Sequence, residues 1–285
     1  SVNSDGETFL SADDLRVNIW HLDDPQTSFN IVDLKPTSIE DLTEVITSCS
    51  FHPTSCHQFA YATSKGAVRL ADMRESALCD RHSKAFKTTA DSAPGPGTSN
   101  FFSEIIQSVS DARFSPDGRY IAARDYLTVK IWDVAMETRP VAVLPVHDHI
   151  RPRLCDLYEN DCIFDRFRVA WTPDAKQVVT GSYGNHFRAC DVDGRGGAEE
   201  IVADKSVFRQ SASGSAGSLG SYQNVGGALK MRPPPTPQPR RLVGRRINSA
   251  SQDAVDASAL DYERKVLSLA VHPHEGTLAV AATSN

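Results

Sequence analysis

The sequence predicts an all-β fold made of repeated antiparallel sheets, and three observations predict it. Short apolar strands recur along the chain, each preceded by a turn that contains proline. The last strand of a repeat alternates apolar and polar residues, as over 128–133, which buries one face of a strand. Three repeats end on an aspartate, and Asp72, Asp133 and Asp191 follow one another at spacings of 61 and 58 residues. Such repeats are typical of the blades of a WD-type β-propeller.

The repeat units share one order of features. An apolar residue precedes a Pro turn, a short apolar strand follows, and an alternating strand ends the unit. Pro116-Asp117-Gly118 is a strong signal for a turn between two strands. The units are, in chain order, a partial one over 8–21 and then 51–72, 114–133, 171–191 and 271–285.

The spacing of the repeats exceeds the usual WD length of about 40–45 residues, so the surplus is expected in loops between blades. These loops are predicted at 29–42, 79–102 and 147–164. We therefore expect about four to five blades of an incomplete propeller, with blades over 1–193 and the start of a further blade over 260–285.

The segment 194–259 differs in composition from the repeats. It is rich in Gly, Ser, Ala and Pro, for example over 214–218 and 233–239, and has no sustained apolar period. It is predicted to be a disordered insertion between blades. Its second half is basic, which fits either a solvated loop or a nuclear-localisation or acidic-partner patch. The basic residues are Lys230, Arg232, Arg240, Arg241, Arg245 and Arg246.

Composition narrows the class of protein further. The net charge of −6 argues against a general nucleic-acid binder. The sequence contains no run of 18 apolar residues, so no membrane span is predicted. No signal peptide opens the chain, and its first residue is Ser, which leads us to expect part of a longer sequence. The six cysteines are widely spaced, as expected for reduced thiols of a cytoplasmic and nuclear protein.

Enzyme and metal motifs are missing from the sequence. Neither a phosphate-binding GxxxxGK[ST] loop nor a GxSxG elbow occurs. The pairs His147/His149 and His272/His274 have no second ligand pair at a recognised zinc spacing. We therefore expect a non-enzymatic protein without catalytic residues, cofactor or metal.

Several long stretches are more specific than a general WD pattern. They resemble the B-family (55-kDa) regulatory subunit of protein phosphatase 2A. The stretches are 1–20, 72–86, 101–106, 124–133 and 157–165. The resemblance covers roughly 1–193 and 260–285. It implies a seven-bladed propeller, of which this chain is an N-terminally truncated part that lacks the early blades and stops before the last strand closes.

The resemblance also implies partners. A family member binds a scaffold subunit and a catalytic subunit in a heterotrimer and selects phosphoprotein substrates with basic segments. Neither nucleic acid nor a membrane is expected among the partners.

Substrates of the related subunits dock on the top face of the propeller. The corresponding positions here are Asp14, Ile39, Leu42, Asp161 and Phe164. Ile39 and Leu42 are spaced i, i+3, as in a short amphipathic helical turn, and Ser38 is a candidate cap. The simpler alternatives are a turn aspartate that bonds only backbone amides at 14, a small helix packed on a blade at 39–42, and a solvated loop at 161–164.

Two functions from different classes follow. In the first, the chain directs a type 2A Ser/Thr phosphatase to its substrates by docking them on an acidic surface. In the second, it is a generic WD-repeat scaffold or a substrate receptor of another complex.

Overall fold

The computed structural model describes residues 1–24, 26–79, 81–87, 100–193, 198–203, 223–225, 228–230, 261–274 and 277–283, with the backbone alone at 100–101, 223–225 and 228–230. The chain divides into two compact units, Ser1–Arg166 and Phe167–Asn285, and each is described by itself.

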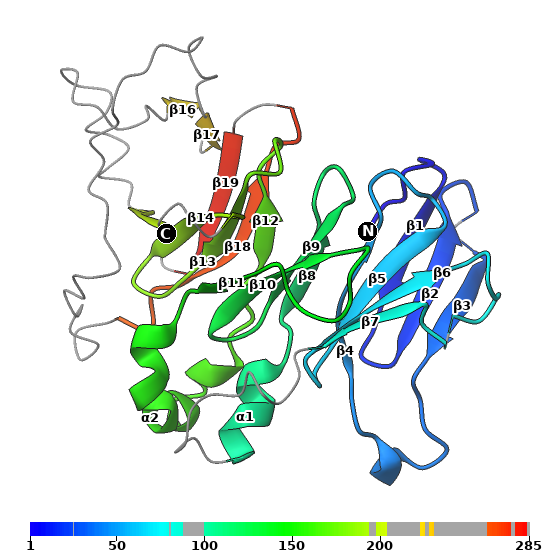
Figure 1. The fold of residues 1–285 in the computed structure, drawn as a ribbon, viewed down its shortest axis with the longest axis horizontal. Coiled ribbons are helices and arrows are strands. Elements are labelled where there is room, and N and C mark those ends of the chain that lie inside the picture. The colour runs from blue at the N-terminus through cyan, green and yellow to red at the C-terminus, as the bar shows by residue number, and fades with distance from the viewer. Residues whose placement is uncertain are drawn as a thin grey trace. The chain divides into compact units, whose positions relative to one another are not determined.

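Unit 1 contains three antiparallel sheets, each of which follows the chain order of its strands (Figure 1). The first sheet has three strands and the other two have four. The strands are β1 (Thr8–Ala12), β2 (Arg16–His21) and β3 (Ser28–Asp33); β4 (Ile46–Phe51), β5 (Gln58–Thr63), β6 (Ala67–Asp72) and β7 (Lys84–Lys87); β8 (Asp111–Phe114), β9 (Tyr120–Arg124), β10 (Thr128–Asp133) and β11 (Ala142–Pro145).

Helices of unit 1 lie in the connections between its sheets and after its last strand. The 3-10 helix η1 (Ile39–Asp41) lies between β3 and β4, and α1 (Asn100–Gln107) precedes β8. After β11 follow η3 (Asp148–Arg153), α2 (Leu154–Glu159) and η4 (Cys162–Phe164). Among the described residues, no helix is long and apolar enough to cross a membrane.

The core of unit 1 lies between neighbouring sheets. On β5, Phe59 and Tyr61 pack toward the first sheet, while Ala60 and Ala62 pack toward the third. Because side chains alternate across a strand, the second sheet is buried on both faces. Its inner strand β5 therefore carries a continuous apolar run, 59–62, rather than a polar face.

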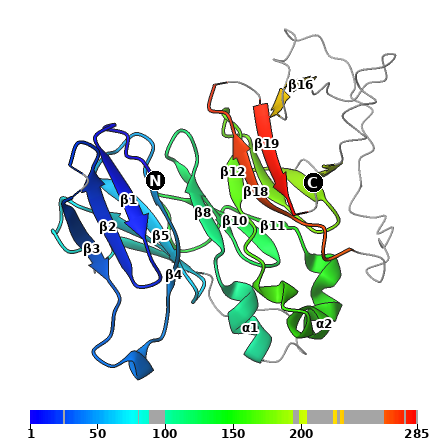
Figure 2. The same ribbon diagram turned by 180° about the vertical axis from the view of Figure 1, so that it is seen from behind.

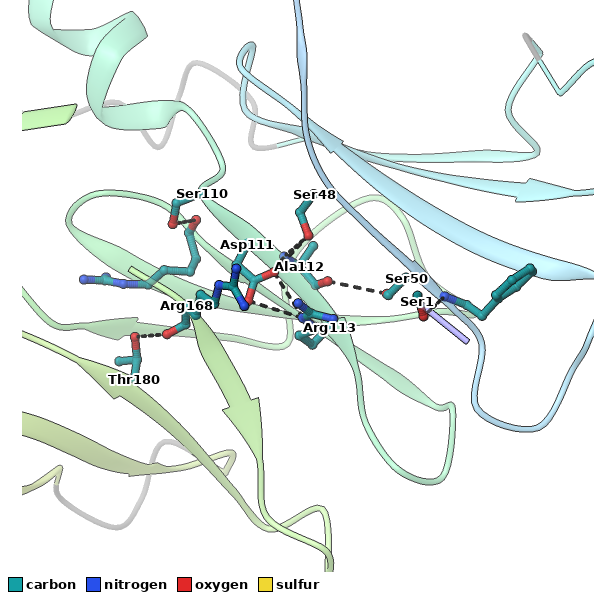
Figure 3. Close-up of polar contacts among 11 residues, drawn as sticks. Ser1, Ser48, Ser50, Ser110, Asp111, Ala112, Arg113, Arg168 and Thr180 are labelled. Atoms are coloured by element: carbon teal, nitrogen blue, oxygen red, sulfur yellow. Dashed lines mark hydrogen bonds and ion pairs between the residues drawn. The ribbon is translucent and has the colours of Figure 1, made fainter. Parts of the chain in front are cut away.

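Polar contacts add to this packing between the second and third sheets. Ser48 of β4 donates a hydrogen bond to the buried carboxylate of Asp111 on β8 (2.8 Å), which also pairs with Arg113 (3.1 Å; Figure 3). The imidazole of His52 lies 3.1 Å from the Gly118 carbonyl, and its other nitrogen accepts from the Ser55 amide (3.0 Å). A carbonyl only accepts, so Nε2 of His52 carries the hydrogen.

A backbone bond also links the first and second sheets. The amide of Cys79, in the β6–β7 connection, donates to the carbonyl of Ile31 on the edge strand β3 (2.6 Å). Cys79 is buried with the core of that sheet.

Unit 2 contains two four-stranded antiparallel sheets, seen from behind in Figure 2. In the first, Thr180 Oγ1 donates to the carbonyl of Arg168 (3.0 Å; Figure 3). The first sheet has β12 (Val169–Trp171), β13 (Gln177–Gly181), β14 (His186–Asp191) and β15 (Glu199–Val202) in order, and the second has β16 (Gln223–Val225), β17 (Ala228–Lys230), β19 (Thr277–Ala282) and β18 (Val266–Val271) in order.

The sheets confirm the predicted all-β, WD-type class. Each predicted repeat supplies consecutive strands of one sheet, and Gly118 (φ 74°) lies in the predicted turn between β8 and β9. The predicted loops at 29–42, 79–102 and 147–164 are wrong in part, because they contain β3, β7 and the helices η3 to η4.

The structure also differs from the predicted insertion. Residues 199–202 form β15, the fourth strand of a blade, and 223–225 and 228–230 pair as β16 and β17. Apart from Ala198 and Ala203, which flank β15, the remainder of 194–259 lies outside the described residues.

Candidate functional site

Asp14 lies in the turn between β1 and β2, and a neighbour holds that turn together. The carboxylate of Asp13 accepts hydrogen bonds from the amides of Leu15 (2.8 Å) and Arg16 (2.6 Å). The side chain of Asp14 is exposed and has no hydrogen-bond or ion-pair partner among the residues that the structure describes. The turn-capping alternative therefore applies to Asp13, and the Asp14 carboxylate is available to a ligand.

Ile39 and Leu42 lie in the loop that carries η1. None of the three η1 residues is buried, and Ile39 exposes 67% of its surface. The suggested Ser38 cap is wrong, because its side chain makes no cap bond; the Ser38 carbonyl instead accepts from the Asp41 amide (3.0 Å). The helix is therefore a projecting 3-10 turn that holds an apolar side chain in solvent.

Asp161 and Phe164 flank η4. Asp161 adopts a left-handed conformation (φ 58°), which reverses the chain after α2 and leaves its exposed carboxylate without a cap bond. Phe164 exposes 54% of its surface, and its ring lies 5.8 Å from that of Tyr158 on α2. This loop thus presents a carboxylate together with an aromatic ring that packs at a tilt on Tyr158.

The structure brings these segments to one end of unit 1. The Asp14 carbonyl accepts from the amide of Ile46, at the start of β4 directly after the η1 loop (2.7 Å). The η1 loop, drawn in blue, and the helices α1 and α2 project beyond the same end of these sheets (Figures 1 and 2). We call the set Asp14, Ile39, Leu42, Asp161 and Phe164 the loop surface; Leu42 is half-buried and the other four are exposed.

A cavity of about 350 Å³ lies within unit 1 between parts of the loop surface. Thr43, next to Leu42, lines it together with Phe164. The ion pair between Lys65 and Glu104 (3.5 Å) joins the β5–β6 turn to α1 in its wall. The other lining residues are Thr47, Ser64, Ile105, Ser108, Val109, Ser110, Tyr126, Ile163, Asp165 and Arg166.

Helix α1 is held in this wall by backbone contacts at its C-terminal end. The amide of Tyr126 donates to the Ile106 carbonyl (3.2 Å), and Gly66 (φ 76°) lies so close to Gln107 that a Cβ there would be 2.9 Å from its carbonyl oxygen. A left-handed glycine is required here both for the turn and for the approach of the helix.

A row of three aromatic rings extends the loop surface beyond the residues that the sequence indicated. Phe102 of α1 packs edge-to-face on Tyr158 of α2 (5.9 Å), which in turn packs on Phe164. Tyr158 lies six positions before Phe164 in a segment that the resemblance covers, and Phe102 lies in another, but only the fold shows that their rings meet.

The arrangement suits the binding of a ligand. Carboxylates without partners attract cationic side chains, and exposed aliphatic and aromatic side chains bury apolar ones. Among the residues that the structure describes, no group of three or more His, Cys, Asp or Glu is placed to hold a metal ion.

Comparison with known proteins fits this architecture. The family model described as "WD domain, G-beta repeat" matches residues 103–133, which run from α1 to the end of β10. The chain is 45% identical, over 287 aligned positions and all of its own length, to "Protein phosphatase PP2A 55 kDa regulatory subunit" of Drosophila melanogaster. It covers 51% of that protein. Over its whole length the chain is therefore similar to a WD-repeat, 55 kDa regulatory subunit of PP2A, and it spans about half the length of that relative.

Proposed function

We propose that this chain is part of a non-catalytic regulatory subunit that directs a type 2A Ser/Thr phosphatase to phosphoprotein substrates. In this proposal it assembles with a scaffold subunit and a catalytic subunit, and the loop surface docks basic segments of the substrates. The similarity to a subunit named as a PP2A regulator supports the choice of phosphatase. The observation that carries the docking role is the exposure of Asp14 and Asp161 close to exposed apolar side chains.

The chain acts by position rather than by bond chemistry. Docking one segment of a phosphoprotein raises the effective concentration of its phosphate near the catalytic subunit, because the second encounter becomes intramolecular. The charged contacts supply selectivity and a salt-sensitive association rate, while the apolar contacts slow dissociation.

Charge reversal at Asp14 tests this proposal. In a full-length version, Asp14→Lys should leave recovery of the scaffold and catalytic subunits unchanged and lower recovery of phosphoprotein substrates roughly tenfold, as for loss of a charged contact at an interface. Co-precipitation followed by quantitative mass spectrometry measures both.

Asp23→Lys is the matched control, because Asp23 is also exposed but lies beyond the opposite end of β2. It should retain both sets of proteins. The proposal fails if the unaltered protein recovers neither phosphatase subunit, or if Asp14→Lys keeps its substrates, as a generic WD scaffold that does not use this carboxylate would.

A further inference from the structure

An ion pair between Glu44 and Arg69 lies at the C-terminal end of the η1 loop. The carboxylate of Glu44, two residues after Leu42, accepts a hydrogen bond from Nη2 of Arg69 on β6 (2.5 Å). The two side chains are only 17% and 19% exposed. The guanidinium of Arg69 also lies over the ring of Tyr61, its cross-strand neighbour on β5 (5.8 Å).

The surroundings of Arg69 hold it in the charged form. Burial alone would lower the pKa of Arg69, but the interactions of its guanidinium with Tyr61 and Glu44 outweigh burial and raise the pKa. Tyr61 is fully buried in the core, so the pair is anchored on a rigid part of the sheet.

The η1 loop itself lacks such anchors. None of the residues 33–45 is buried, and the hydrogen bonds within η1 are local ones between backbone groups. Backbone bonds fix the chain before the loop, where Leu34 donates to the Leu15 carbonyl (2.8 Å), and again directly after Glu44. There Val45 exchanges bonds with Ser64 (2.9 and 3.1 Å), and Ile46 donates to the Asp14 carbonyl. Glu44 is therefore the point at which the projecting loop meets the sheet.

We propose that Glu44 and Arg69 are positioning residues that orient the η1 loop, so that Leu42 and Ile39 face a bound partner together with Asp14. This inference rests on the proposed docking function. The pair acts through Leu42: with the pair intact the loop has one orientation, and without it the loop samples several, so a partner must order it on binding.

The test replaces both charges at once. Glu44→Met with Arg69→Met keeps side-chain volume, and replacing a whole buried pair by apolar residues is often neutral for stability. We expect the melting temperature to stay unchanged and the amides of 38–43 to exchange hydrogen faster. The affinity for a fluorescein-labelled amphipathic peptide, of about 20 residues with leucines on one face and arginines on the other, should fall roughly fivefold in fluorescence anisotropy.

A double-mutant cycle separates positioning from general loss of structure. In a Leu42→Ala background, the same double replacement should no longer change peptide affinity, because the loop has lost the side chain that the pair positions. An undiminished loss in that background, or unchanged exchange at 38–43, would overturn the inference. If the Met pair lowers the melting temperature, Glu44→Gln, which keeps shape and an acceptor, goes through the same cycle with the same criteria.

The pair of Arg188 and Glu200 in unit 2 supplies the control. It is similarly buried, at 18% and 26% exposure, with a separation of 3.4 Å. Replacing both by Met should alter neither exchange at 38–43 nor peptide affinity, and an equal effect there would contradict the inference. Failure of the unaltered chain to bind the peptide contradicts docking instead, whereas the exchange measurement still tests the loop's orientation.

Discussion

The aspartates that end the repeats share one structural task. Asp72, Asp133 and Asp191 are the last residues of β6, β10 and β14. Each carboxylate contacts a side chain at the first residue of the preceding strand, or one residue before it. Gln58 donates to Asp72 (3.3 Å), Gln177 donates to Asp191 (2.8 Å), and Arg119 pairs with Asp133 (3.5 Å). The acid therefore closes the hairpin between the two middle strands, which is why it recurs at the end of each unit.

Asp72 makes a pH-dependent contribution that can be measured. A fork of two bonds from Arg74 (2.9 and 2.6 Å) is the largest cause of the pKa of Asp72 lying well below its ordinary value. Because the folded-state pKa is lowered, this contribution is present above about pH 4 and is lost as the pH falls below that value. Arg74→Ala should lower the free energy of unfolding only slightly at pH 7, since Arg74 is largely exposed and water screens the pair.

The comparison with acid conditions completes that test. In urea titrations at decreasing pH, the difference between the original chain and Arg74→Ala should shrink below pH 4. A difference that stays constant down to about pH 2 would mean that Arg74 acts through packing and not through the charge of Asp72.

At the scale of elements, the contact of two sheets depends on one turn. Gly118 has φ 74°, and a Cβ there would overlap the His52 imidazole of the neighbouring sheet. Gly118→Ala should therefore lower the free energy of unfolding by about 2–4 kcal/mol, from backbone strain plus overpacking. Chemical denaturation followed by tryptophan fluorescence measures it.

A second glycine separates the two causes. Gly6 has nearly the same φ, 72°, but open space around its Cβ position. Gly6→Ala should cost only the backbone strain, about 1–2 kcal/mol. Equal costs at Gly6 and Gly118 would contradict a role for the His52 contact.

Sequence reasoning located the middle strands of the blades and missed most of the outer ones. Strands such as Tyr120–Arg124 and Thr128–Asp133 are buried by neighbours on both sides, so their apolar pattern is clear. The outer strands Lys84–Lys87 and Glu199–Val202 have one neighbour each and short, partly exposed sequences. Their existence follows from pairing with an inner strand, which no local pattern reports.

The candidate site, too, could be predicted only in part from the sequence. Asp14 and Phe164 were accessible to sequence comparison, yet the choice between Asp13 and Asp14 as turn residue required the hydrogen bonds of the turn. The pairing of Glu44 with Arg69 joins residues 25 positions apart, and their spacing alone gives no signal.

For the whole molecule, the reactivities of the six cysteine thiols report on both units at once. Cys155 is exposed, whereas Cys79 of unit 1 and Cys190 of unit 2 are buried. With a thiol reagent at pH 8, Cys155 should react first, and Cys79 and Cys190 only after unfolding, because burial blocks the reagent. Burial also raises the pKa of the Cys49 thiol, so its thiolate fraction falls and it should react slowly.

Mass spectrometry of labelled peptides resolves the six sites. Early labelling of Cys190 together with protection of Cys79 would indicate that unit 2 opens while unit 1 stays folded. Early labelling of both would contradict the packing described for the two units.

The bond from the Cys79 amide to the Ile31 carbonyl has a consequence for solubility. An outer strand such as β3 offers a row of backbone acceptors to any passing extended chain, and that is how sheets from different molecules join into aggregates. By occupying one acceptor in the middle of that row, the β6–β7 connection interrupts the row at Ile31. Shortening that connection should therefore cause precipitation at high protein concentration before it causes any loss of fold.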